Sequence, residues 1–140
     1  MKNLFLLAVM VFTVSFAGYG NAVTKKTADD QVNPVQTYNI RLGLVTTSGT
    51  PTLSGSYDLG GFYAKNIETG TYYYSYPNRV NGFLQLPAFI HNLPEGTYEF
   101  GAFQGQGGWM AVSPKTVTVS SGMEDADGYI TIYLDIAWEE

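Results

Sequence analysis

The segment "FQGQGGW", residues 103–109, carries the side chains best suited to contacting a ligand. Its three glycines leave the backbone accessible, and two glutamines offer amide donors and acceptors. The aromatic residues at either end present flat apolar rings of the kind that stack on a sugar or pack on a peptide. No lysine-serine pair and no helix follows, so the segment lacks a phosphate-binding signature. The predicted binding residues are Phe103, Gln104, Gln106 and Trp109.

We predict that this segment is a flexible loop, because ordering glycine costs more backbone entropy than ordering any other residue. On that reasoning Trp109 is at least partly exposed and contributes to binding. The alternative is a hairpin loop whose tryptophan folds back over one end of the protein, since burial of an indole ring is strongly favourable.

The acidic segment "EDADG", residues 124–128, resembles part of a calcium-binding loop, because hard cations collect carboxylates on tight turns. The complete spacing of such loops, including a distal glutamate, is absent. A solvated acidic turn is the better explanation of Glu124, Asp125 and Asp127. We therefore predict no resident metal and no more than weak calcium binding.

His91 is the single histidine, and the chain has no cysteine. A zinc site needs three or four nitrogen, sulfur or carboxylate ligands, which one imidazole cannot supply. No G-x-S-x-G nucleophile sequence is present, and hydrolysis by paired carboxylates requires a cleft that a small β-sandwich rarely encloses. We predict that His91 is a surface residue near a turn, and that the protein has no catalytic residue, no cofactor and no enzymatic activity.

The N-terminal residues have the layout of a secretory signal peptide. Lys2 precedes an apolar run over residues 4–16, and the small-residue segment "AGYGNA" follows. A run of about 13 residues is shorter than the roughly 20 needed to span a bilayer. We predict a signal peptide over residues 1–22, cleaved after Ala22; a retained N-terminal anchor is the alternative.

The composition of the remaining chain limits its location and its partners. Residues 23–34 are polar and aperiodic, which predicts a flexible leader. The absence of cysteine leaves no lipid-acceptor residue, so we predict a secreted or periplasmic protein from a bacterium, with no membrane span in the mature chain. Without Lys2 the net charge is about −6, which disfavours nucleic acid and anionic membranes as partners.

From residue 35 onwards, apolar and polar residues alternate with a period of two, and no window shows helical periodicity. This pattern predicts one all-β domain over residues 35–140, an antiparallel β-sandwich of about seven strands. A hairpin turn is expected at 68–70, and Pro87 is expected at a sheet edge or bulge. The residues predicted to point inward are Tyr38, Ile40, Leu42, Leu44, Leu84, Leu86, Ala88, Ile90, Tyr98, Phe100, Ala102, Val117, Val119, Ile130, Ile132, Leu134, Ile136 and Trp138.

Aromatic residues fall both on positions predicted to face the core and on positions predicted to face outward. In "TYYYSY" the alternation places Tyr72, Tyr74 and Tyr76 on one face, which we assign to the core, and Tyr73 on the other. A further set of aromatic residues falls on positions predicted to face outward. An apolar patch formed by them would mark an interface, unless loops or the leader cover it. This set consists of Phe83, Phe89, Phe103 and Tyr133.

The segment from Leu84 to Ala102 contains an apolar strand, the turn "NLPEGTY" and a second core strand. In this order and spacing it resembles the prealbumin-like sandwiches, including the carboxypeptidase regulatory-like and collagen-adhesin B-type modules. The resemblance implies a prealbumin-like fold and a non-catalytic role. The prealbumin-like hydrolases of urate breakdown need several histidines and a C-terminal Tyr-Arg-Gly-Ser, and both are missing here.

Two functions follow from these features. The first is a secreted, non-enzymatic binding module that contacts a protein or carbohydrate partner at the cell exterior through an outer sheet face and the 104–109 loop. The second is a secreted protease inhibitor that presents the same glycine-rich loop to an active-site cleft.

Overall fold

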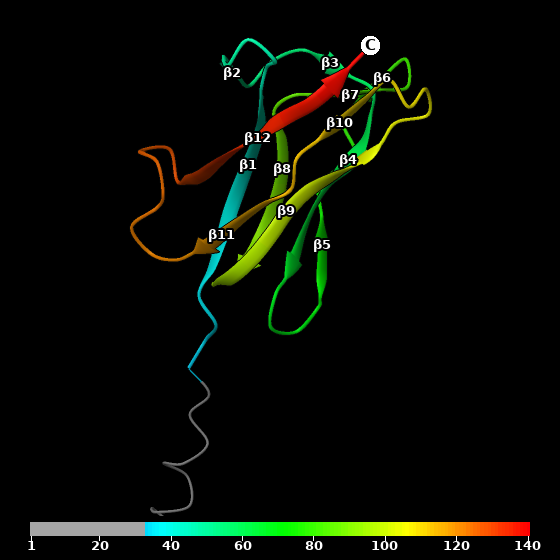
Figure 1. The fold of residues 1–140 in the computed structure, drawn as a ribbon. Coiled ribbons are helices and arrows are strands. Elements are labelled where there is room, and N and C mark those ends of the chain that lie inside the picture. The colour runs from blue at the N-terminus through cyan, green and yellow to red at the C-terminus, as the bar shows by residue number, and fades with distance from the viewer. Residues whose placement is uncertain (1–32) are drawn as a thin grey trace, which may run out of the picture. The chain divides into compact units, whose positions relative to one another are not determined.

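The structure is a computed structural model that describes residues 33–140, and every regular element in this range is a β-strand (Figure 1). The predicted all-β fold is therefore confirmed. The predicted signal peptide, residues 1–22, and nearly all of the predicted leader, residues 23–34, lie outside the described residues. In the described range there is no helix that is long and apolar enough to cross a membrane.

The described chain divides into six longer and six very short strands, and the predicted number of about seven corresponds to the longer ones. The longer strands are β1 (Thr37–Val45), β4 (Leu59–Asn66), β8 (Ala88–Pro94), β9 (Gly96–Gln104), β11 (Lys115–Val119) and β12 (Tyr129–Glu139). The short strands are β2 (Pro51–Thr52), β3 (Ser56–Tyr57), β5 (Tyr72–Tyr74), β6 (Arg79–Val80), β7 (Phe83–Gln85) and β10 (Met110–Val112).

The longer strands form two sheets that enclose one core, as an open sandwich (Figure 1). The first sheet has the order β10-β12-β1-β2, with β8 also paired to β1, and the second has the order β11-β9-β4-β5. A small third sheet contains β3, β7 and β6. Of the nine strand pairings, eight are antiparallel, as predicted. The exception is the pair β1 and β12, which run parallel from Asn39↔Tyr129 to Val45↔Asp135.

The core consists mainly of the residues that period-two alternation places inward. Every inward position predicted for β1 and for the segment from Leu84 to Ile90 is buried, and so are Tyr98, Phe100 and Val119. Ala102 and Val117 are partly buried and pack against this cluster. Trp138 was predicted to be inward and is 41% exposed. The reason is that β12 extends past the core, where only the short strand β10 pairs with it.

The prediction that Tyr72, Tyr74 and Tyr76 are core residues is wrong, because all three are exposed. The hairpin between β4 and β5 turns at the expected residues, and its register places Tyr73 opposite the buried Ala64. Tyr73 therefore points inward, where its ring packs edge-on against Tyr98 at 5.9 Å. Its two neighbours on β5 must then face outward, since side chains alternate across a strand.

The turn "NLPEGTY" carries the chain from one sheet to the other. It leaves β8, which pairs with β1, and enters β9, which pairs with β4 and β11. Gly96 has a φ of 153°, a backbone conformation that residues with a side chain rarely adopt. The hydroxyl of Tyr98 donates to the carbonyl of Pro94 at 2.8 Å, which fastens the new strand to the turn.

Candidate binding surfaces

The glycine-rich loop between β9 and β10 closes around Asp58, the residue between β3 and β4. The side chain of Asp58 is buried and accepts backbone hydrogen bonds from Gly107 at 3.3 Å and Trp109 at 2.9 Å. The carbonyl of Asp58 accepts a third from Gly105 at 3.1 Å. A loop with three backbone amides directed at one residue is ordered by that residue, and sequence reasoning missed this role of Asp58.

Two of the loop glycines are needed because other atoms occupy the space of a side chain. A Cβ atom at Gly105 would overlap a carboxylate oxygen of Asp58. A Cβ atom at Gly107 would lie 2.7 Å from the indole ring of Trp109. The glycines therefore allow the chain to wrap tightly around the carboxylate of Asp58. The sequence prediction had explained them only by the flexibility of the loop.

Trp109 is 52% exposed, which confirms the prediction of partial exposure. Its indole ring lies near Phe83, with ring centroids 6.2 Å apart. The ring borders an open hollow of about 220 Å³. The other residues around this hollow are Ser56, Tyr57, Asp58, Phe83, Met110, Glu139 and Glu140.

The predicted site residues do not form a single site. Gln104 and Gln106 line a different hollow, of about 380 Å³, together with Gly60, Gly82, Gly105 and Arg79. The guanidinium of Arg79 donates to the carbonyls of Gly60 and Gly82 and thereby shapes the floor of this hollow. Phe103 points to neither hollow but to the outer face of the second sheet, where it contacts other aromatic rings.

Four aromatic side chains gather on the outer face of the second sheet, and we call them the aromatic platform. Ring centroids are 5.1 Å apart between Tyr63 and Phe103, and 5.6 Å apart between Tyr63 and Tyr72. The rings of Tyr72 and Tyr74 are nearly parallel at 6.0 Å, and Tyr74 lies 6.2 Å from Phe103. The three outer members are exposed by 43% (Tyr72), 62% (Tyr74) and 46% (Phe103).

Strand register brings these rings together. Tyr63 lies on β4 between Tyr74 of β5 and Gly101 of β9, its two directly paired neighbours. Gly101 makes room for the ring, since a Cβ atom there would overlap the phenol of Tyr63. The hydroxyl of Tyr63 donates to the carboxylate of Glu99 at 3.2 Å. Burial, and then the negative charge of Glu99, raises the pKa of Tyr63 above its ordinary value, so this phenol stays neutral at physiological pH.

Polar and charged side chains border the platform. The ammonium of Lys65 lies 5.6 Å from the centre of the Tyr72 ring, a cation–π contact. Lys65 is paired in register with Glu99, so one positive and one negative charge lie side by side on this face. Beyond them, the hydroxyls of Thr97 and Thr118 are hydrogen-bonded at 2.9 Å.

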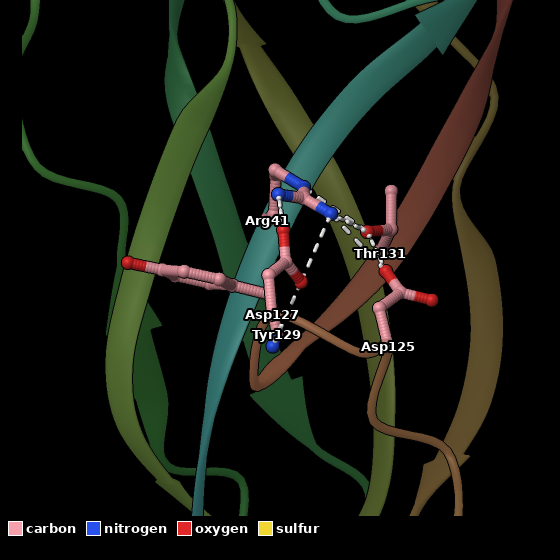
Figure 2. A network of polar contacts seen from close by, with 5 residues as sticks. All are labelled: Arg41, Asp125, Asp127, Tyr129 and Thr131. Atoms are coloured by element: carbon pink, nitrogen blue, oxygen red, sulfur yellow. Dashed lines mark hydrogen bonds and ion pairs between the residues drawn. The ribbon is translucent and has the colours of Figure 1, made fainter.

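The acidic segment 124–128 is tied to the outer face of the first sheet by Arg41 of β1 (Figure 2). The guanidinium pairs with Asp127 and, at 3.2 Å, with Asp125, and it lies 5.2 Å from the ring centre of Tyr129. It also donates to the hydroxyl of Thr131, which in turn donates to Asp125 (Figure 2). The hydrogen bond between Arg41 and Asp127 lowers the pKa of Asp127 and raises the pKa of Arg41.

Arg41 therefore supplies the positive charge that a cation would otherwise provide to Asp125 and Asp127. Glu124 is exposed and takes no part in this network. Among residues 33–140 no group of three histidine, cysteine, aspartate or glutamate side chains is arranged to hold a metal ion. Weak calcium binding at this segment stays a prediction.

His91 is exposed, as predicted from its place near the turn. Its Nδ1 lies 3.3 Å from the side-chain oxygen of Asn39, and its ring is parallel to that of Phe89 at 6.0 Å.

The outward-facing aromatic residues of the sequence prediction do not form one patch. Phe89 contacts Tyr129 on the first sheet, whereas Phe83 lies near Trp109 and Phe103 belongs to the aromatic platform. Tyr133 is half-buried.

Comparisons with models of known protein families, with curated protein sequences and with solved structures found no match.

Proposed function

We propose that this protein is a secreted or periplasmic, non-enzymatic binding module. It contacts a protein or carbohydrate partner at the cell exterior through the outer face of the second sheet and the 104–109 loop. The observation that carries this proposal is the aromatic platform, because aromatic side chains clustered on an exposed sheet face mark an interaction site. Trp109, exposed on a loop that Asp58 holds in place, supports the participation of the loop.

The resemblance of residues 84–102 to prealbumin-like modules agrees with this role, and we propose membership of that group. An open sandwich with two main sheets over one core supports the proposal at the level of architecture.

A protease inhibitor is the second candidate, and the loop geometry speaks against it. An inhibitory loop offers an extended backbone to the protease cleft, where its amides and carbonyls pair with the enzyme. In this loop the amides of Gly105, Gly107 and Trp109 are directed inward to Asp58 and are already hydrogen-bonded. We therefore place the binding module first.

The test is capture of partners from the surface fraction of the producing cell, compared between the parent and Phe103→Ala and Trp109→Ala variants. Met123→Ala is the matched control, because it removes an exposed apolar side chain in the loop between β11 and β12. We expect capture to be lost with the first two variants and kept with the control. Equal capture by all four proteins would contradict the proposal, and stoichiometric inhibition of a protease would favour the second candidate.

A further inference from the structure

We propose that the aromatic platform binds a neutral, extended chain of pyranose sugars by stacking. This inference rests on the proposed function, since it names the class of partner that the outer face of the second sheet takes. It assigns Tyr63, Tyr72, Tyr74 and Phe103 as the stacking residues. Sequence reasoning had placed two of these tyrosines in the core, so the site is visible only once the register of β5 is known.

The chemistry of the rings fits the faces of pyranose sugars. The C–H groups on such a face carry partial positive charge, and the face of an aromatic ring carries partial negative charge. Centroid spacings between neighbouring platform rings run from 5.1 to 6.2 Å, and the four rings form a closed group in which Tyr63 and Tyr74 each neighbour both Tyr72 and Phe103. An extended glycan would therefore cross the group and contact some of the rings at once, not all four in sequence.

The charges on this face favour a neutral ligand. Lys65 and Glu99 are paired neighbours of opposite sign, so the polar border of the platform has no net charge to offer an ionic partner. The hydroxyls of Tyr72 and Tyr74 make no hydrogen bond to any described residue and are free to contact sugar hydroxyls. A hollow lined by the amide groups of Gln104 and Gln106 lies next in sequence to Phe103.

The central ring of the platform is already fixed in the unbound protein. Tyr63 lies against Gly101 and is hydrogen-bonded to Glu99, so binding costs little side-chain entropy at this position.

The experiment is calorimetric titration of the full mature chain with neutral hexasaccharides: cellohexaose, xylohexaose, mannohexaose and laminarihexaose. Hexagalacturonate serves as the anionic comparison. We expect at least one neutral hexasaccharide to bind with a Kd of about 1 mM or tighter, and hexagalacturonate to bind more weakly. Tyr74→Ala and Phe103→Ala should each weaken binding by about tenfold.

Tyr76→Ala is the matched control. It removes a tyrosine from the same segment that is more exposed than Tyr74, and none of the aromatic ring pairs of the described residues includes it. It should leave affinity unchanged, and the melting temperature of each variant shows whether it is folded. The inference is overturned if no neutral hexasaccharide binds at concentrations up to about 10 mM. It is also overturned if the two platform variants bind like the parent, or if hexagalacturonate binds best.

The outcome also separates this inference from the proposed function. Loss of partner capture in Phe103→Ala without any hexasaccharide binding would retain the binding module and assign the face to a protein. A concentration-dependent dimer that Tyr74→Ala abolishes would assign the aromatic platform to a second copy of the chain. That result would overturn the proposal of glycan binding. Absence of both capture and sugar binding would contradict both proposals.

Discussion

Asp58 is the residue on which the shape of the glycine-rich loop depends. It accepts hydrogen bonds through both carboxylate oxygens and its own carbonyl, and it is the one buried charged or polar side chain of the described residues. Its signal in the sequence is weak: a single acidic residue between Tyr57 and Leu59, where alternation offers no reason for a charge. Only the fold reveals that its partners are some 50 residues away.

Replacing Asp58 with alanine should destabilise the protein by about 1–3 kcal/mol, because two backbone N–H groups would lose their acceptors. The same change should raise acrylamide quenching of Trp109, measured in a Trp138→Phe background. Asp135→Ala is the control, since it removes an exposed carboxylate. Unchanged stability and quenching in Asp58→Ala would show that the loop does not need this acceptor.

Arg41 controls the ionisation of Asp127. The lowered pKa of Asp127 means that its ionised form stabilises the folded state above the ordinary value of 3.8, and that this contribution is lost as pH falls through the lowered pKa. In an Arg41→Gln variant, carboxyl titration followed by NMR should show the pKa of Asp127 moving upward. Stability should then fall less steeply with acid than in the parent.

The control is Lys65→Gln, which removes a cation from the other sheet and should leave the pKa of Asp127 unchanged. High salt should reduce the difference between the parent and Arg41→Gln, because both aspartates are about half exposed. A pKa of Asp127 that is the same in the parent and in Arg41→Gln would contradict this role of Arg41.

At the level of elements, alternation predicted which residues share a face but not always which face is buried. For β1 the answer was clear, since one face is apolar and the other is polar or glycine. For β5 both faces carry tyrosine, and only the pairing of Tyr73 with the buried Ala64 shows which face is buried. The parallel pairing of β1 with β12 was also beyond the sequence, because a period of two is the same for either strand direction.

The stability of the folded protein should depend on core side chains from both sheets. Phe100 of β9 and Leu134 of β12 are both completely buried. Phe100→Ala should cost about 3–5 kcal/mol and Leu134→Ala about 2–5 kcal/mol in the free energy of unfolding, through lost burial and the cavity left behind. Chemical denaturation measures both. Thr116→Ala on the exposed face of β11 is the control and should change stability by less than about 0.5 kcal/mol.

At the scale of the whole molecule, export and processing are predictions from the N-terminal sequence. We expect the exported chain to begin at Val23, because small residues precede that position at the cleavage site. Mass spectrometry of protein recovered outside the cytoplasm measures this directly. An intact Met1 or a lipid adduct on the recovered chain would contradict the predicted processing.

The parallel pairing of β1 with β12 has a mechanical consequence. Seven residue pairs join these strands, and Arg41 and Thr131 connect them through their side chains as well (Figure 2). Because the strands run in the same direction, the start of β1 and the end of β12 lie at opposite ends of the pair. Tension between those two points would load the interstrand hydrogen bonds lengthwise and all at once, whereas tension across a hairpin peels them apart one after another. The domain should therefore resist stretching between the start of β1 and the end of β12.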